Sequence, residues 1–101
     1  MILPTKMTKI KQLFSEIQTK NIAIVDVRTR EEHAQISIPN TLHIPLDELP
    51  LRLNELSGFS EVHFFCKAGM RAKTACAIAF EAKIQCFAIS EGVFEIAERL
   101  S

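Results

Sequence analysis

The sequence predicts an α/β fold in which helices cover both faces of a central parallel sheet. Two observations lead to this prediction. Segments with the spacing of amphipathic helices alternate along the chain with short, almost entirely apolar runs. These runs lack the apolar–polar alternation of a strand that has one face in water, so we expect both of their faces to be buried.

Four segments have the character of strands. NIAIVDV (21–27) and EVHFF (61–65) are nearly continuous apolar runs, and CFAIS (86–90) is a shorter one. TLHIP (41–45) is the weakest of the four, because Pro45 has no N–H to donate to a sheet and ends the segment. The chain therefore supplies one strand between each pair of helical segments.

The first helical segments are short. TKIKQLFSEIQTK (8–20) is expected to form a helix with Thr8 as its N-cap and with four apolar side chains on one face, at Ile10, Leu13, Phe14 and Ile17. TREEHAQ (29–35) predicts a short helix. LDELPLRLNEL (46–56) predicts two helical pieces, because Pro50 fits the first turn of a helix better than its interior.

The last two helices have clearer apolar faces. MRAKTACAIAFEA (70–82) predicts an amphipathic helix whose buried face carries Ala72, Ala75, Cys76, Ala79 and Phe80. VFEIAERL (93–100) is expected to bury Val93, Ile96, Ala97 and Leu100. Phe94 falls off that face, so we expect it at the surface.

Composition narrows the function classes. The 101 residues suit a single domain (1–101), and 48% hydrophobic with 24% charged residues is typical of a globular protein. Twelve cationic and twelve anionic side chains cancel, which argues against a nucleic-acid or membrane-surface protein. No apolar run is long enough to span a bilayer, and the N-terminus lacks the pattern of a secretory signal.

The three cysteines and three histidines show no metal-ligand spacing, so no metal is expected. An odd number of cysteines without a disulfide framework indicates reduced thiols and a cytoplasmic protein. Cys76 and Cys86 are expected to be inert side chains in or near the core. A resolving role for either cysteine is the alternative, for which the sequence gives only weak motivation. The sequence does not indicate an oligomeric state.

The predicted sheet also predicts where a ligand binds. In parallel α/β folds, ligands bind beyond the carboxyl ends of the strands, here after Val25, Phe65 and Ile89. Cys66 comes directly after the second of these strands. Asp26 and Arg28 follow the first strand, and the segment 90–92 follows the third.

The loop from Cys66 to Arg71 has the features of an anion cradle. Five backbone N–H groups, from Lys67 to Arg71, precede or open a helix, and a helix N-terminus stabilises a nearby anion by ~0.3–1 kcal/mol. Gly69 supplies a position that tolerates positive φ. The charges of Lys67 and Arg71 add to the effect, and the Arg71 guanidinium suits an oxyanion such as a sulfonate or phosphate. We therefore expect a reactive thiolate at Cys66, although a structural cysteine beside two solvated cations is the alternative.

Three motifs resemble those of one family. CKAGMR (66–71) matches the Cys-x-x-Gly-x-Arg loop of rhodanese-like sulfurtransferases, and IVDVRTREEH (24–33) is similar to their Asp-Val-Arg segment with its following glutamate. IPNTLHIPLDELPLRLNEL (38–56) resembles their Ile-Pro-Gly-Ala…Ile-Pro-Leu stretch. The resemblance covers nearly the whole chain, in the family's order and spacing.

The resemblance implies a three-layer domain with about five mainly parallel strands, and it implies a reaction. Cys66 would take a sulfane sulfur from thiosulfate or a persulfide and pass it to a thiol, cyanide or protein acceptor, without a cofactor. Substrate would be held by Lys67, Ala68, Gly69, Met70 and Arg71. A loop of six residues resembles the sulfurtransferases, whereas the phosphatases and arsenate reductases of the superfamily have one residue more. A binding or sulfur-relay module that acts only with a partner protein stays an alternative.

Two further points stay open at this stage. Asp26 and Arg28 are either catalytic or, as we expect, support the loop, with Arg28 paired to Glu32. The chain also departs from the family pattern, which leaves the donor and acceptor open. The departures are Ile36-Ser37 for Gly-His, Asn40-Thr41 for Gly-Ala, Ala72 for a serine or threonine, Glu91 for a glycine and Ile96 for a tryptophan.

Overall fold

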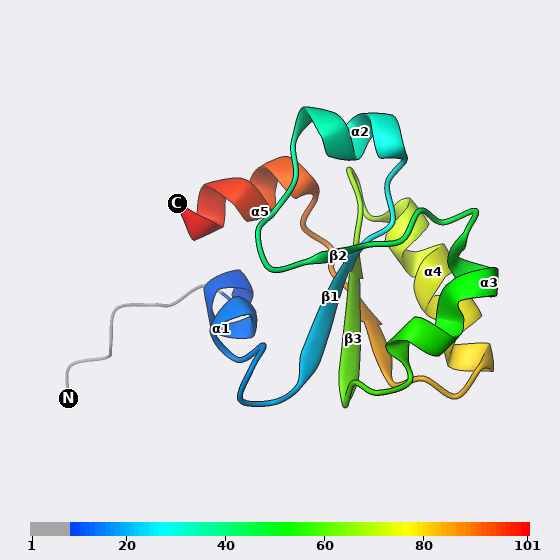
Figure 1. Cartoon of the computed structure of the whole chain (residues 1–101). Coiled ribbons are helices and arrows are strands. Elements are labelled where there is room, and N and C mark those ends of the chain that lie inside the picture. Colours follow the sequence, from blue (N-terminus) through cyan, green and yellow to red (C-terminus); the bar gives the residue numbers. More distant parts are fainter. Residues whose placement is uncertain (1–8) are drawn as a thin grey trace.

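The computed structural model describes residues 9–101, and its centre is one parallel sheet (Figure 1). Its strands lie in the order β2-β1-β3-β4 and comprise β1 (Ile22–Asp26), β2 (Leu42–His43), β3 (Glu61–Phe65) and β4 (Cys86–Ala88). All three neighbouring pairs are parallel. The α/β class is confirmed. The resemblance implied about five strands, whereas residues 9–101 form four, one from each apolar run.

Helices separate the strands along the chain, as the alternation predicted. They are α1 (Lys9–Ser15), α2 (Arg30–Gln35), α3 (Leu49–Arg52), α4 (Met70–Glu81) and α5 (Val93–Leu100), with a 3-10 helix η1 (Leu53–Leu56) directly after α3. The first helix is shorter than the predicted 8–20, because the chain turns after Ser15 and reverses at Asn21, whose φ is +54°. The expected N-cap Thr8 lies outside the described residues.

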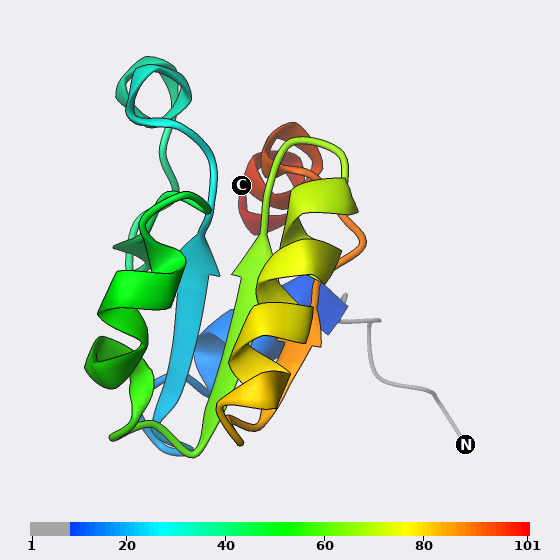
Figure 2. The same cartoon turned by 90° about the vertical axis from the view of Figure 1, so that its right-hand side faces the viewer.

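Helices lie on both sides of the sheet (Figure 2), and an apolar layer packs on each of its faces. All five residues of β1 are buried, and successive side chains point to opposite layers. Ala23 and Val25 belong to the layer that contains the buried residues of α3 and α4, while Ile22 and Ile24 join the layer of α1 and α5. The continuous apolar pattern of the strands therefore reflects burial on both sides.

The helical faces follow the predictions with one exception. Leu49 and Leu56 are fully buried, and Pro50 lies in the first turn of α3. Phe80 was predicted on the buried face of α4 but is 74% exposed. The fully buried residues of that face are alanines, at Ala72, Ala75 and Ala79, and the residue after Ala79 is rotated about 100° away from them. Phe94 is exposed, as expected.

In the part of the chain that the structure describes, no helix combines the length and apolar character that crossing a lipid bilayer requires.

Candidate functional site

Cys66 lies where the sequence placed it, between the end of β3 and the start of α4. Its side chain is only 1% exposed, and the backbone N–H of Gly69 donates to its Sγ over 3.0 Å. Gly69 has φ +96°, so the predicted positive φ is confirmed. A β-carbon at Gly69 would lie no closer than 3.6 Å to the Ser90 carbonyl oxygen, so the loop needs glycine there for its backbone conformation rather than for space.

Gly92, in the segment that follows β4, supports the same loop. The N–H of Val93 donates to the Cys66 carbonyl over 2.9 Å. A β-carbon at Gly92 would lie 1.8 Å from the carbonyl oxygen of Lys67, although φ at Gly92 is an ordinary −81°. Here the missing side chain, not the backbone conformation, allows the close approach. Sequence analysis placed segment 90–92 at this edge but assigned Gly92 no role.

Arg71, in the first turn of α4, pairs with Glu32 of α2. Its Nη1 and Nη2 donate to the two carboxylate oxygens over 2.5 and 3.0 Å. Glu32 is also part of a capping box with Thr29, which fixes the start of α2. The hydrogen bonds from Arg71, followed by those from Thr29, lower the pKa of Glu32 from 4.5 to about 2. The pairing also raises the pKa of Arg71, so both groups are charged at neutral pH.

The predicted pairing of Arg28 with the Glu32 carboxylate is therefore wrong. Arg28 is 2% exposed, and its guanidinium donates to both carboxylate oxygens of Asp26, which is fully buried. Its remaining N–H groups reach the backbone carbonyls of Glu32 and Ile36. The Asp26 carboxylate is buried beside Arg28 and accepts most of its guanidinium hydrogen bonds. The Glu32 carboxylate, which is more exposed, therefore pairs with Arg71.

The other predicted loop residues lie at the surface of the protein. The side chains of Lys67 and Ala68 are exposed, and Met70 is 73% exposed. Ala72, a departure from the family pattern, is fully buried in the core layer that also contains Cys66. This places its side chain against the core rather than on the surface of the loop.

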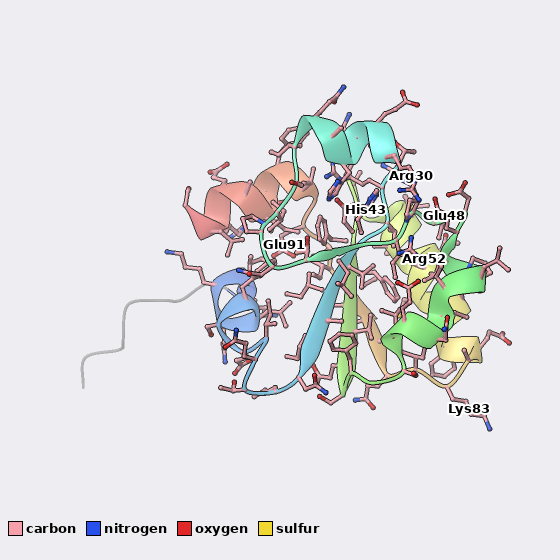
Figure 3. All side chains as sticks on the ribbon, in the orientation of Figure 1. Arg30, His43, Glu48, Arg52, Lys83 and Glu91 are labelled. Carbon is pink, nitrogen blue, oxygen red and sulfur yellow. The ribbon has the colours of Figure 1, made fainter. Side chains whose placement is uncertain are left out.

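Glu91, which departs from the glycine of the family pattern, lies beside Ser90 in the segment after β4. Its carboxylate accepts from Ser90 Oγ over 3.1 Å, and it lines a cavity of about 490 Å³ together with residues of α1, such as Lys9 and Gln12. Figure 3 shows Glu91 toward α1 and α5, apart from Arg30 and Glu48.

A second cavity adjoins Arg71. It has a volume of about 440 Å³ and is lined by Val27, Thr29, Arg30, Pro45, Leu46, Asp47, Glu48 and Arg71. Arg30 donates to both oxygens of Glu48, and Arg52 also pairs with Glu48 (Figure 3). Arg52 pairs with Glu55 as well. The lining of the cavity therefore carries both charges, and Arg71 is the residue that it shares with the Cys66 loop.

Sequence analysis did not predict the pairing of His33 and His43. Their rings stack at a centroid distance of 4.0 Å with an angle of 6° between planes, and His43 Nε2 lies 2.8 Å from the Arg28 carbonyl oxygen. Burial, and after it the neighbouring His43, lower the pKa of His33. Among residues 9–101, no three His, Cys, Asp or Glu side chains are grouped as a metal site requires.

Comparison with known proteins identifies the family. A family model described as a rhodanese-like domain matches residues 9–99. The chain belongs to the rhodanese-like domain family. Over 59 residues this rhodanese-like chain is 37% identical to a sulfurtransferase of Allochromatium vinosum, covering 58% of this chain and 55% of that protein. The chain spans 30–55% of the length of the curated relatives that it matches.

Solved structures agree with the family assignment. The human single-domain sulfurtransferase TSTD1 superposes with a TM-score of 0.73 at 28% identity, covering 89% of this chain and 93% of that chain. A rhodanese-like domain protein from Staphylococcus aureus gives a TM-score of 0.76 at 28% identity, covering 86% of each chain. The rhodanese-like chain thus shares its fold with a protein named as a sulfurtransferase and with another named as a rhodanese-like domain protein.

Proposed function

We propose that this rhodanese-like chain is a sulfurtransferase that carries a sulfane sulfur as a persulfide on Cys66. The observation that carries the proposal is the contact between the Gly69 N–H and Cys66 Sγ at 3.0 Å, at the start of α4. A backbone donor and a helix N-terminus at the sulfur both favour the thiolate, which is the nucleophilic form of cysteine.

The reaction consists of two nucleophilic attacks. The Cys66 thiolate attacks the sulfane sulfur of thiosulfate, the donor's S–S bond breaks, and sulfite leaves with the bonding electron pair. An acceptor thiolate or cyanide then attacks the outer sulfur of the Cys66 persulfide. That S–S bond breaks in turn, and the electron pair returns to Cys66. Splitting the transfer into two steps is covalent catalysis and requires no other group.

Different residues of the loop bind the sulfur and the anionic part of the donor. The amide of Gly69 stabilises the sulfur anion, and Lys67 and Arg71 face the anionic part of a donor. The Arg71 guanidinium also donates to Glu32. This contact fixes the orientation of Arg71 toward a sulfur donor and neutralises part of its charge. This arrangement serves persulfide donors of lower charge as well as thiosulfate. In the cell, we place the protein in the cytoplasm, a compartment that favours reduced thiols.

Mass spectrometry of the intact protein tests the proposal. After incubation with thiosulfate or a low-molecular-weight persulfide, the wild type should gain the mass of one sulfur atom and lose it again with cyanide or a thiol. Cys66→Ser should never gain it, whereas the control Cys76→Ser, which keeps Cys66, should. If no donor adds sulfur to the wild type, the proposal is wrong.

A partner-dependent sulfur relay is the second candidate. The observation in its favour is the exposure of two large apolar side chains, Met70 at 73% and Phe94 at 60%, in the first turns of the two helices that follow the Cys66 loop and Gly92. Exposed apolar side chains at a site favour contact with a protein. In that case the persulfide forms, but turnover with free cyanide stays negligible until an acceptor protein is added.

A further inference from the structure

Cys76 and Cys86, which the sequence analysis treats as inert, are in contact. Cys76 belongs to α4 and Cys86 opens β4, and their Sγ atoms lie 2.8 Å apart. The Cys86 thiol also donates to the backbone carbonyl of Cys76 over 3.2 Å. Both are free thiols in the structure. The S–S bond of a disulfide is about 2.05 Å long, so a bond requires the sulfurs to approach by less than about 1 Å.

The two thiols are far from the Cys66 edge of the sheet. Cys86 is aligned with Val62, near the start of β3, whereas Cys66 follows the end of β3. They are also accessible from solvent, because both are only partly buried and Cys86 lines a surface cavity of about 730 Å³. Lys83, another residue of that cavity, lies at the opposite end of the molecule from Arg30 and His43 (Figure 3). A small oxidant therefore reaches this pair of partly buried thiols without passing the candidate active site.

We propose that Cys76 and Cys86 form a dithiol that a hydroperoxide oxidises to a disulfide. With hydrogen peroxide, the Cys76 thiolate attacks one oxygen, the O–O bond breaks, and Cys76 becomes a sulfenic acid while hydroxide leaves and takes up the released proton as water. The Cys86 sulfur then attacks the Cys76 sulfur, the S–O bond breaks, and a second water leaves with the Cys86 proton. In total, two thiols and one peroxide give one disulfide and two waters.

The environment of Cys86 supports the order of these steps. Burial, together with the neighbouring Cys76 sulfur, raises the pKa of the Cys86 thiol to about 12. Cys86 therefore keeps its proton at neutral pH, and Cys76 is the sulfur that meets the peroxide first. Cys86 reacts second, after Cys76 has been oxidised, because the two sulfurs are already in contact at 2.8 Å.

The disulfide would join two elements that hold the Cys66 loop. Helix α4 begins at Met70, within this loop, and the segment after β4 carries Gly92, which packs against the Lys67 carbonyl. A bond between Cys76 and Cys86 closes a short loop of chain and restricts the unfolded state. Oxidation is therefore expected to raise the Tm of the protein by at least ~5 °C. This proposal does not depend on sulfur transfer at Cys66.

Peptide mapping tests the proposal directly, because trypsin separates all three cysteines. Cleavage after lysine and arginine places Cys66 in fragment 53–67, Cys76 in fragment 74–83 and Cys86 in fragment 84–99. The folded protein is treated with one equivalent of hydrogen peroxide, alkylated in denaturant and digested without reductant. The expected product is fragment 74–83 linked to fragment 84–99, in a monomer that has lost two hydrogen masses and regains them with dithiothreitol.

Cysteine-to-serine variants show which cysteines form the link. Cys66→Ser should form the same linked peptides, while Cys76→Ser and Cys86→Ser should form neither the link nor the rise in Tm. The proposal is overturned if peroxide leaves both fragments separately alkylated, if it links either of them to fragment 53–67, or if the link joins two chains.

Discussion

Glu32 and Arg71, 39 positions apart in the sequence, join α2 to the first turn of α4 through two hydrogen bonds of 2.5 and 3.0 Å. The Cys66 loop ends at Arg71, so this ion pair ties the loop to the segment that follows β1. It is also the contact that the sequence analysis assigned to a different arginine, Arg28. The contribution of the Glu32–Arg71 pair can be measured from the pH dependence of stability and from the kinetics of sulfur transfer.

The stability of the protein should depend on pH through Glu32. The pKa of Glu32 is lowered from 4.5 to about 2 in the folded state, so the unfolded state binds a proton first as pH falls. The stabilisation is therefore complete above about pH 4.5 and is lost as pH falls through about 2. In urea titrations, Glu32→Gln should lower the free energy of unfolding at pH 7 by about 1 kcal/mol, and the difference from wild type should shrink toward pH 3.

The exposed neighbour Glu31 provides the matched control. Glu31→Gln removes the same charge from α2 and should change stability little at either pH. Equal effects of the two substitutions would show that helix charge, not the Arg71 contact, causes the pH dependence.

Arg71→Lys should impair sulfur transfer from thiosulfate. Lysine keeps the charge but lacks the planar fork that meets both oxygens of Glu32, so its position beside Cys66 is no longer fixed. We expect kcat/KM to fall by ~10-fold or more in steady-state assays. Arg99→Lys, the same change at an arginine that pairs with exposed Glu95, should leave kcat/KM near wild type. A loss of the same size in both variants would contradict this interpretation.

Gly92→Ala should disrupt the Cys66 loop. The added β-carbon would lie 1.8 Å from the Lys67 carbonyl oxygen and 2.8 Å from its carbon. Since both atoms belong to the backbone, the loop must shift, and we expect a loss of at least ~2 kcal/mol in chemical denaturation together with reduced persulfide formation. At Gly58 nothing lies within 4 Å of an added β-carbon, so Gly58→Ala should change stability by less than ~1 kcal/mol. Equal stability of the two variants would refute the close approach.

Asp26→Asn should be strongly destabilising because it removes the charge that balances a buried arginine. Arg28 is only 2% exposed, so solvent cannot take the place of the carboxylate. Breaking a buried pair by changing one partner costs about 3–5 kcal/mol. In contrast, Glu95→Gln, which breaks an exposed pair with Arg99, should cost less than ~1 kcal/mol. Similar values from urea denaturation would argue against the buried pair as a support of the site.

His33 should titrate below the ordinary histidine range in NMR spectra. Burial and the stacked His43 lower its pKa, so the folded state resists protonation more than the unfolded state does. The stabilisation from His33 is therefore complete above the unfolded pKa of about 6.5 and decreases as pH falls below it. His43→Phe keeps an aromatic ring beside His33 but removes the imidazole, and it should raise the pKa of His33. An unchanged value would exclude His43 as a cause.

The strands, most of the helical faces and the Cys66 loop could be predicted because their signals are local. Val25 and Phe65 end apolar runs, Gly69 follows Cys66 at a fixed spacing, and parallel strands bring their carboxyl ends to one edge of the sheet. The prediction for Phe80 was wrong because periodicity does not indicate where the neighbouring layer ends. Nothing in the sequence predicted the role of Gly92 except its position at the carboxyl edge of the sheet.

Sequence alone thus establishes the fold class, the family and the position of the candidate nucleophile, because short-range periodicity and motif spacing encode them. Only the tertiary structure decides which side chains meet. It pairs Arg71 with Glu32, buries Arg28 against Asp26, stacks His33 on His43 and brings Cys76 to Cys86. Three of these four contacts join residues on different helices or strands. The choice of partner therefore depends on burial and on the packing of α2, α4 and β4 around the sheet, which the order of residues along the chain does not reveal.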